Sequence, residues 1–183
     1  MKSPVQKPVF RIALCAVVAG LAVAVMLLTA LLPVGTYALP VFAGALLIAV
    51  VVEYGAKWAF GVYAVAAVLS FFVAADKEAA LYFAMFFGYY PVLKSLIERK
   101  IMKKPLCLLV KLAVFNVAAV ASFFLATLVL GVPISEFSLF GVNMPLVFLL
   151  IGNVFFLFYD RALTIFAVFY VRKLRDKLFR GVH

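Results

Sequence analysis

The chain has 183 residues, of which 69% are apolar and only 13% are charged, and its formal net charge is +10. Soluble domains carry roughly 25% charged residues, and a soluble chain of this size has no means of burying so much apolar surface. The composition therefore excludes a soluble globular protein. It predicts an all-α integral membrane protein, because the apolar runs are too long for the strands of a membrane barrel.

Six apolar segments follow one another along the chain, and each is long enough to cross a bilayer, for which about 20 helical residues suffice. The first is too long for the apolar region of a signal peptide and is expected to be retained. Pro91 is expected to kink the fourth segment. We predict a single membrane domain, a six-helix bundle with spans at 10–32, 36–54, 56–75, 79–97, 106–130 and 144–171, followed by a basic tail, 172–183.

The basic residues between the spans predict the orientation of the bundle. Loops rich in Lys and Arg stay on the cytoplasmic side of a membrane. With the N-terminus inside, Lys77 alone lies outside, next to Asp76 and Glu78. Both termini are therefore expected in the cytoplasm, unless the barely separated second and third spans form a re-entrant pair. The residues on the inner side are Lys2, Lys7, Arg11, Lys57, Arg99, Lys100, Lys103, Lys104, Arg172, Lys173, Arg175, Lys177 and Arg180.

Four of the charged residues within the predicted spans stand out, because a charge inside the membrane is costly and needs an explanation. They are Lys94, Lys111, Asp160 and Arg161, and all are expected in the inner half of the membrane. One interpretation is an ion-pair cluster that fixes helix packing, with Asp160 paired to Lys111 or Lys94. A second is a binding site for an anionic group of a substrate. A third, a proton relay, is disfavoured by a single carboxylate among three cations.

Polar uncharged residues fall on the same predicted helix faces. Asn153 lies seven residues before Asp160, and Tyr90 lies four before Lys94, so each pair shares a face. Asn116, Asn153 and Tyr90 are expected to line a polar seam between helices, where they would contact a ligand. The alternative for each Asn is an interhelical hydrogen bond, which contributes about 0.6 kcal/mol on average. The candidate substrate-binding residues are Tyr90, Lys94, Lys111, Asn116, Asn153 and Asp160.

The segment from Phe86 to Pro91 places two tyrosines between Gly88 and Pro91. Such a segment breaks a span and exposes its backbone to a cavity. The alternative is an ordinary kink near the inner interface.

Motifs for catalysis and metal binding are missing from the sequence, which has no nucleotide-binding loop, HExxH, GxSxG or CxxC. Cys15 and Cys107 lie within or at the edge of apolar runs and are expected to be small buried side chains. We therefore expect no enzyme activity, no cofactor and no metal. No separate basic domain is present to bind nucleic acid.

Small residues recur every four positions in the first span, at Ala16, Gly20 and Ala24. Such a stripe lets another helix approach closely, either a span of the same chain or a second protein. This is the candidate partner interface.

These features together resemble the S components, the substrate-binding subunits of energy-coupling factor (ECF) transporters. The resemblance covers the whole chain in layout and the first span in motif. It implies a subunit that binds a vitamin-like small molecule in a bacterial cytoplasmic membrane. It also implies docking through the stripe onto a coupling transmembrane subunit that works with ATPases. Members of the family bind their ligand towards the external face, whereas the charged residues here are expected in the inner half.

Two other functions remain open. An MreD-type scaffold subunit of the cell-elongation machinery has a similar length and number of spans, and it binds proteins rather than a small molecule. A membrane enzyme that acts on lipid would need clustered carboxylates or histidines, and it ranks last.

Overall fold

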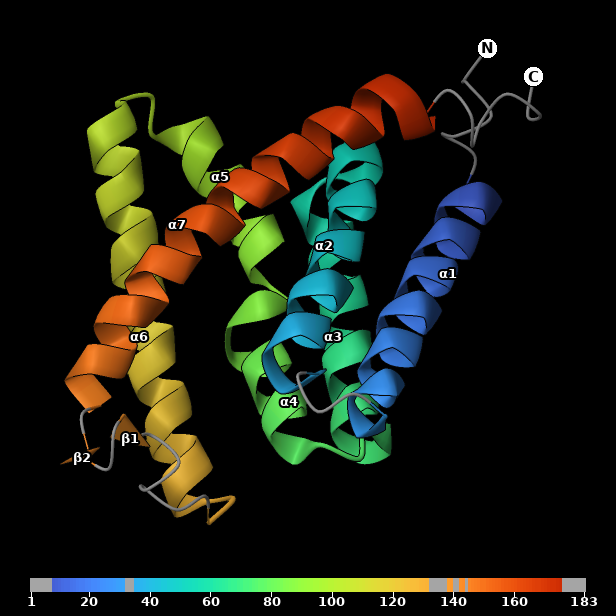
Figure 1. Ribbon diagram of the computed structural model, residues 1–183. Helices are drawn as coiled ribbons and strands as arrows, with labels where there is room; N and C mark the ends of the chain where they lie inside the picture. The colour runs from blue at the N-terminus through green and yellow to red at the C-terminus, as the bar shows by residue number, and fades with distance from the viewer. Residues whose placement is uncertain (1–7, 32–34, 132–137, 140–141, 144, 176–183) are drawn as a thin grey trace.

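The computed structural model describes residues 8–31, 35–131, 138–139, 142–143 and 145–175, which form a helical bundle (Figure 1). A π-helical turn, η3, joins α4 to α5, a second, η5, extends α7, and a single 3₁₀ turn, η2, follows α1. The elements are α1 (Pro8–Leu27), η2 (Leu28–Ala30), α2 (Gly35–Tyr54), α3 (Ala56–Val73), α4 (Lys77–Tyr82), η3 (Phe83–Phe87), α5 (Tyr90–Lys100), α6 (Lys104–Leu128), α7 (Pro145–Phe169) and η5 (Tyr170–Leu174). Between α6 and α7, β1 (Ser138–Leu139) pairs antiparallel with β2 (Val142–Asn143).

Within the described residues, six helical segments are long and apolar enough to cross a membrane. The expectation of an all-helical chain with six such segments is confirmed, apart from the two-residue strand pair. Glu136 and His183 lie outside the described residues. The segments are Pro8–Leu27, Gly35–Tyr54, Ala56–Val73, Lys77–Lys100, Lys104–Leu128 and Leu149–Leu174.

The first three helices pack against one another, and α2 is the central element, since it contacts α1, α3, α4, α5, α7 and η3. Small side chains make this close packing possible. Ala22, Ala43, Ala59 and Ala66 are fully buried where α1, α2 and α3 meet, and Met26 fills the space beside them. Because lipid tails are as apolar as the side chains, close van der Waals contact rather than the hydrophobic effect holds such helices together.

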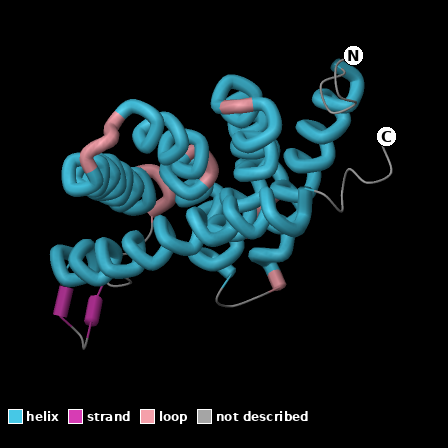
Figure 2. Tube along the Cα trace, turned by 90° about the horizontal axis from the view of Figure 1, so that it is seen from above, coloured by secondary structure: helices cyan, strands magenta, loops and turns pink. Residues whose placement is uncertain are grey.

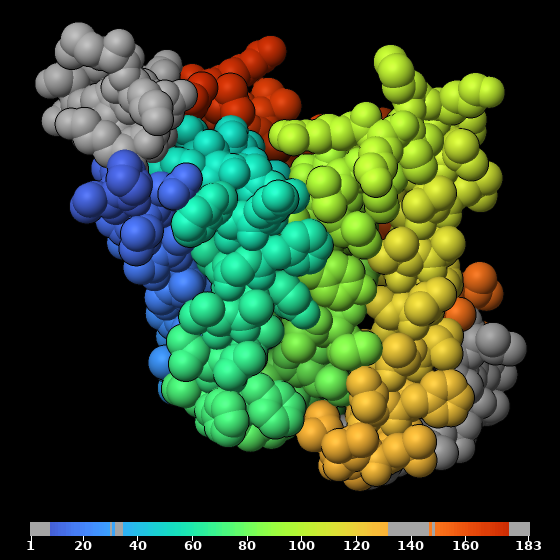
Figure 3. Space-filling view, turned by 180° about the vertical axis from the view of Figure 1, so that it is seen from behind, coloured from blue at the N-terminus to red at the C-terminus, as the bar shows by residue number. Residues whose placement is uncertain are grey.

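The last two long helices are arranged differently. Helix α7 crosses the bundle obliquely, and seen from above it lies along one side of the other helices (Figures 1 and 2). It contacts both α2 and α6. From behind, the surface is hollowed between α6, in yellow, and the green segment that contains α4 and α5 (Figure 3).

The two described ends of the chain, the α2–α3 turn and the α5–α6 connection lie at one end of the bundle (Figure 1). Gly55, with φ of 82°, makes the sharp α2–α3 turn, a conformation that favours glycine. We call this the basic end, because Lys57, Arg99, Lys100, Lys103, Lys104, Arg172, Lys173 and Arg175 are exposed there.

The opposite end is held by local hydrogen bonds around the α3–α4 turn. The Asp76 carboxylate caps α4, accepting hydrogen bonds from the backbone N–H groups of Glu78 and Ala79. It also accepts a hydrogen bond of 2.6 Å from the Thr36 hydroxyl at the start of α2. Lys77 donates to the carbonyl of Phe71, in the last turn of α3, and to that of Ala74, the residue that follows the helix.

Candidate functional site

The helical segment from Lys77 to Lys100 is broken near its middle. In η3 the N–H of Gly88 bonds the carbonyl of Phe83, five residues earlier, at 2.8 Å. Pro91 lies in the first turn of α5 and has no N–H to offer the carbonyl of Phe87, four residues earlier. The regular hydrogen-bond ladder therefore loses donors at two places, the carbonyls of Ala84 and Phe87.

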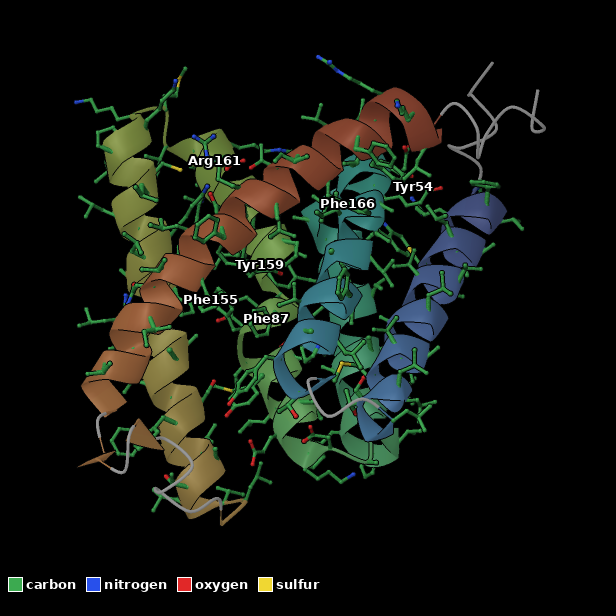
Figure 4. The ribbon with its side chains drawn as sticks, viewed as in Figure 1. Tyr54, Phe87, Phe155, Tyr159, Arg161 and Phe166 are labelled. Atoms are coloured by element: carbon green, nitrogen blue, oxygen red, sulfur yellow. The ribbon has the colours of Figure 1, made fainter. Side chains whose placement is uncertain are left out.

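Tyrosines from two other helices supply the missing donors. The Tyr63 hydroxyl of α3 donates to the carbonyl of Ala84 at 2.6 Å. The Tyr159 hydroxyl of α7 donates to the carbonyl of Phe87 at 3.4 Å. Figure 4 shows Tyr159 and Phe87 close together in the middle of the bundle. The break is thus tied to the helices on both sides of it, as a backbone in a membrane requires.

Glycines allow the broken segment to approach its neighbours. A Cβ atom added to Gly44 of α2 would lie 2.1 Å from the Phe87 carbonyl oxygen, and one added to Gly88 would lie 2.7 Å from the Tyr63 ring. Neither position has room for a side chain. The expectation that Phe86–Pro91 interrupts the span agrees with this geometry. The carbonyls of Ala84 and Phe87 are covered by side chains and backbone of neighbouring helices.

Aromatic rings surround the break and connect it to α6 and α7. Phe86 stacks on Tyr90 with ring centroids 4.8 Å apart. Phe115 of α6 stacks on Phe156 of α7 at 4.9 Å, and both meet the edge of Phe86. Tyr90 and Phe156 are almost fully buried. This cluster gives the polar groups next to it a rigid, apolar surrounding.

A cluster of charges lies beside the aromatic rings, towards the basic end. Lys94 of α5 contacts Asp160 Oδ1 of α7 at 2.6 Å. Lys111 of α6 contacts both oxygens of the same carboxylate, at 3.1 and 3.2 Å. The Tyr90 hydroxyl donates to Asp160 Oδ1 at 2.6 Å. Asp160 therefore joins three helices at one point.

A second carboxylate, Glu98, completes the cluster. Its Oε1 lies 2.8 Å from the Lys94 Nζ and 2.6 Å from the Lys111 Nζ. The side chains of Lys94 and Lys111 are 7% and 6% exposed and that of Asp160 is 14% exposed, whereas that of Glu98 is 44% exposed. The two cations are therefore buried and matched by two anions, one deep and one at the surface. We call these four residues the charge cluster.

The two asparagines form a separate contact. Asn116 Nδ2 donates to Asn153 Oδ1 at 2.9 Å, and Asn153 Nδ2 donates to Asn116 Oδ1 at 3.0 Å. Each amide also donates to a carbonyl one turn earlier in its own helix, Leu112 or Leu149. Both N–H groups of each amide are thus used, and the pair links α6 to α7.

The structure brings four of the predicted substrate-binding residues together, namely Tyr90, Lys94, Lys111 and Asp160. The sequence left open whether Asp160 pairs with Lys94 or with Lys111, and in the structure it pairs with both. Arg161 is exposed, and within the described part of the chain it makes no ion pair. Its side chain lies towards the basic end (Figure 4).

Sequence reasoning missed four residues of this region. Glu98 carries a usable signal, because it follows Lys94 by four residues on one helix. Gly44, Tyr63 and Tyr159 carry none, since their roles depend on which helices lie next to the break.

The small-residue stripe of α1 faces away from the bundle. Ala16, Gly20 and Ala24 are exposed, and a Cβ atom on Gly20 would meet nothing within 4 Å. The opposite face, which includes Ala19 and Ala22, packs on the neighbouring helices. The described part of the chain therefore does not use the stripe for packing.

Arg175, the last residue that the structure describes, links the end of η5 to α2. Arg175 Nε lies 3.0 Å from Glu53 Oε1, and the Glu53 side chain is only 1% exposed. Arg11 of α1 stacks over the Trp58 ring of α3 at 4.0 Å nearby, at the same end of the bundle. These contacts fix the ends of the helices at the basic end.

Comparison with protein-family models, with curated proteins and with solved structures gives no match. Among the residues that the structure describes, no group of three or more His, Cys, Asp and Glu residues is placed to hold a metal ion.

Proposed function

We propose that this protein is the membrane substrate-binding subunit of a multicomponent small-molecule importer, similar to an ECF S component. The observation that carries the proposal is the outward-facing stripe of Ala16, Gly20 and Ala24. A helix face of small residues binds lipid tails poorly, because it offers few atoms for contact, and it binds another helix well, because the backbones come close.

In this proposal the basic end faces the cytoplasm. Eight exposed Lys and Arg residues gather at that end, whereas Lys77 lies at the other end beside Asp76 and Glu78. The positive-inside rule supports an orientation with both termini in the cytoplasm. The proposed importer function implies six spans across the cytoplasmic membrane of a bacterial cell. Anionic lipid headgroups lie against the same residues.

The proposed mechanism assigns binding to this chain and energy to its partners. The chain has no nucleotide-binding loop and is not itself an enzyme in this proposal, so ATPases coupled through a transmembrane subunit drive the transport. The ligand, a vitamin-like small molecule, binds between the spans near the charge cluster. Binding favours one conformation, and the ATP-driven partner shifts the subunit to the conformation that releases the ligand.

Affinity purification from the native membrane tests the proposal. The wild-type chain is expected to bring down two ATPases and a multi-span coupling subunit. Gly20→Leu places a bulky side chain on the stripe and is expected to lose these partners while the isolated protein keeps its helical content. Gly61→Leu on α3 is the matched control, because Gly61 is also exposed with nothing within 4 Å of a Cβ atom. Retention of the partners by Gly20→Leu would refute docking through the stripe.

One observation favours a second candidate, a scaffold subunit of the MreD type. Lys94, Lys111, Asp160 and Glu98 satisfy one another, as a purely structural cluster would. Recovery of cell-wall synthesis or shape proteins, with no ATPase, would establish the scaffold in place of the importer.

A further inference from the structure

The two buried lysines share one atom of the surface carboxylate. Lys94 Nζ and Lys111 Nζ lie 2.8 and 2.6 Å from the same oxygen, Glu98 Oε1. They also share Asp160 on their deep side. Two ammonium groups from α5 and α6 thus converge on a point that one carboxylate oxygen occupies, which is the arrangement of an anion-binding site.

The two carboxylates of the charge cluster differ in how they are held. Asp160 Oδ1 receives hydrogen bonds from Tyr90, Lys94 and Lys111 together, and its side chain is 14% exposed. Glu98 is 44% exposed and belongs to the last turn of α5, at the basic end. Rotation about the side-chain bonds of Glu98 is enough to move its carboxylate into the open, whereas Asp160 is fixed by its partners.

Removal of the Glu98 carboxylate leaves the site with two positive charges and one negative charge. An uncompensated buried cation is strongly unfavourable, so such a site demands another anion. The lysines supply six N–H donors in total, enough for an oxyanion with two or three oxygens as well as Asp160.

We propose that Lys94 and Lys111 form a binding site for a carboxylate or phosphate group, which Glu98 fills in the ligand-free protein and which an incoming anion takes over by displacing it. This inference rests on the proposed function, because it identifies the imported substrate as a small molecule with an anionic group. Asp160 and Tyr90 hold the two ammonium groups in place, and Glu98 competes with the ligand.

The same chemistry has two possible sources. A soluble anion reaches Glu98 from the aqueous side of the basic end. A phospholipid headgroup reaches it from the membrane surface, guided by the exposed cations Arg99, Lys100, Lys103 and Lys104 next to it. The experiment must therefore vary the lipid and the soluble anion separately.

The test measures thermal unfolding of the full chain in nanodiscs of zwitterionic phosphatidylcholine. Sodium acetate and sodium phosphate are titrated against sodium chloride at equal ionic strength. The variants are Glu98→Ala, Glu98→Gln, which keeps the shape of the side chain should Glu98→Ala not fold, and Glu98→Ala combined with Lys111→Met. Lys100→Met combined with Glu98→Ala is the matched control, because Lys100 is an exposed lysine of the same helix end.

The Glu98 variants are expected to unfold at a lower temperature than the wild type and to regain most of the loss, saturably, in acetate or phosphate. Half-saturation is expected at an anion concentration about tenfold lower than in the wild type, since Glu98 no longer competes. The Lys111→Met combination is expected to show no recovery and the Lys100→Met combination full recovery. Recovery without added salt in nanodiscs that contain anionic phosphatidylglycerol would identify the headgroup as the source.

Two results would overturn the proposal. One is a folded Glu98 variant whose unfolding temperature is unchanged by acetate, by phosphate and by phosphatidylglycerol. The other is a wild-type protein whose unfolding temperature does not change at acetate or phosphate concentrations far above those that saturate the Glu98 variants. Glu98 would then be a permanent structural counter-ion. Both measurements use the isolated chain, so the loss of transport partners in the affinity experiment leaves them unaffected. The two proposals therefore fail separately.

Discussion

Tyr159 of α7 donates a hydrogen bond to the backbone carbonyl of Phe87, the carbonyl that lacks a helical donor because Pro91 follows it by four residues. The contact links the oblique helix α7 to the broken segment at the centre of the bundle. The next residue of α7, Asp160, joins the charge cluster. A single turn of α7 therefore holds both the backbone break and the buried charges, so movement of α7 would disturb both together.

Gly44→Ala is expected to destabilise the protein strongly. The added Cβ would lie 2.1 Å from the Phe87 carbonyl oxygen, so α2 and the broken segment must separate. Forcing extra atoms into a packed interior costs typically about 1–3 kcal/mol. Chemical unfolding in detergent micelles measures the change.

Gly61→Ala on α3 is the control for that substitution. Gly61 also lies within a helix, but its Cβ would meet nothing within 4 Å. The free energy of unfolding of the Gly61→Ala variant is expected to equal that of the wild type or to exceed it slightly, because alanine is more favourable than glycine in a helix by about 1 kcal/mol. Equal losses in both variants would show that the approach of Gly44 to Phe87 does not matter.

Tyr63→Phe is expected to cost more stability than Tyr159→Phe. Both changes keep the ring and remove the hydroxyl that serves a free carbonyl, but the Tyr63 bond is 2.6 Å long and the Tyr159 bond is 3.4 Å long. A hydrogen bond contributes about 1 kcal/mol, and weakens as it lengthens. Hydrogen exchange of backbone amides in η3 should quicken in Tyr63→Phe, and an unchanged rate would argue against the role assigned to Tyr63.

Asp160→Asn is expected to lower the free energy of unfolding by about 3 kcal/mol, because it removes one partner of a buried charge group. The amide keeps the shape of the side chain but leaves Lys94 and Lys111 with Glu98 as their only carboxylate in the charge cluster. Unfolding titrations and expression level together give the result. Normal stability and expression would show that Asp160 is not a structural counter-ion.

Arg161→Gln gives the contrast for Asp160→Asn. It also removes one charge, one residue further along the same helix, but the side chain is exposed. Its effect on stability is expected to fall within about 0.5 kcal/mol of zero, as is usual for exposed positions. The two changes move the net charge in opposite directions, so a loss as large as that of Asp160→Asn would mean that removing any charge from this turn of α7 destabilises the protein, whether or not the residue belongs to the charge cluster.

The sequence alone was sufficient for the coarse architecture, because the length of an apolar run reports directly whether a helix can cross a bilayer. It also singled out Lys94, Lys111 and Asp160, since a charge within an apolar run must have a partner or a task. Glu98 was missed because it falls among the charged residues at the end of a span, where carboxylates are common. Its spacing of four residues from Lys94 was the signal that the sequence offered, whereas its contact with Lys111, from another helix, depends on how α5 and α6 pack.

The break between α4 and α5 was visible in the sequence through Gly88 and Pro91, but the residues that complete it were not. Which carbonyls lose their donors follows from the position of Pro91 and from the π-helical turn. Which side chains reach those carbonyls depends on how α3 and α7 cross the segment. Helix crossing in membranes is set by local packing of small residues, for which a single sequence gives little information.

The asparagine pair provides the last prediction, a double-mutant cycle with Asn116→Ala, Asn153→Ala and both together. Each single change leaves the other amide without its partner, and the double change removes both polar groups. The coupling energy is expected to be about 0.6 kcal/mol and no more than about 1.7 kcal/mol, the range for hydrogen bonds between membrane helices. Unfolding of the four proteins in the same detergent measures it. A coupling energy of zero would mean that the amides do not hold α6 to α7, and they would then be free to contact a ligand as the sequence first suggested.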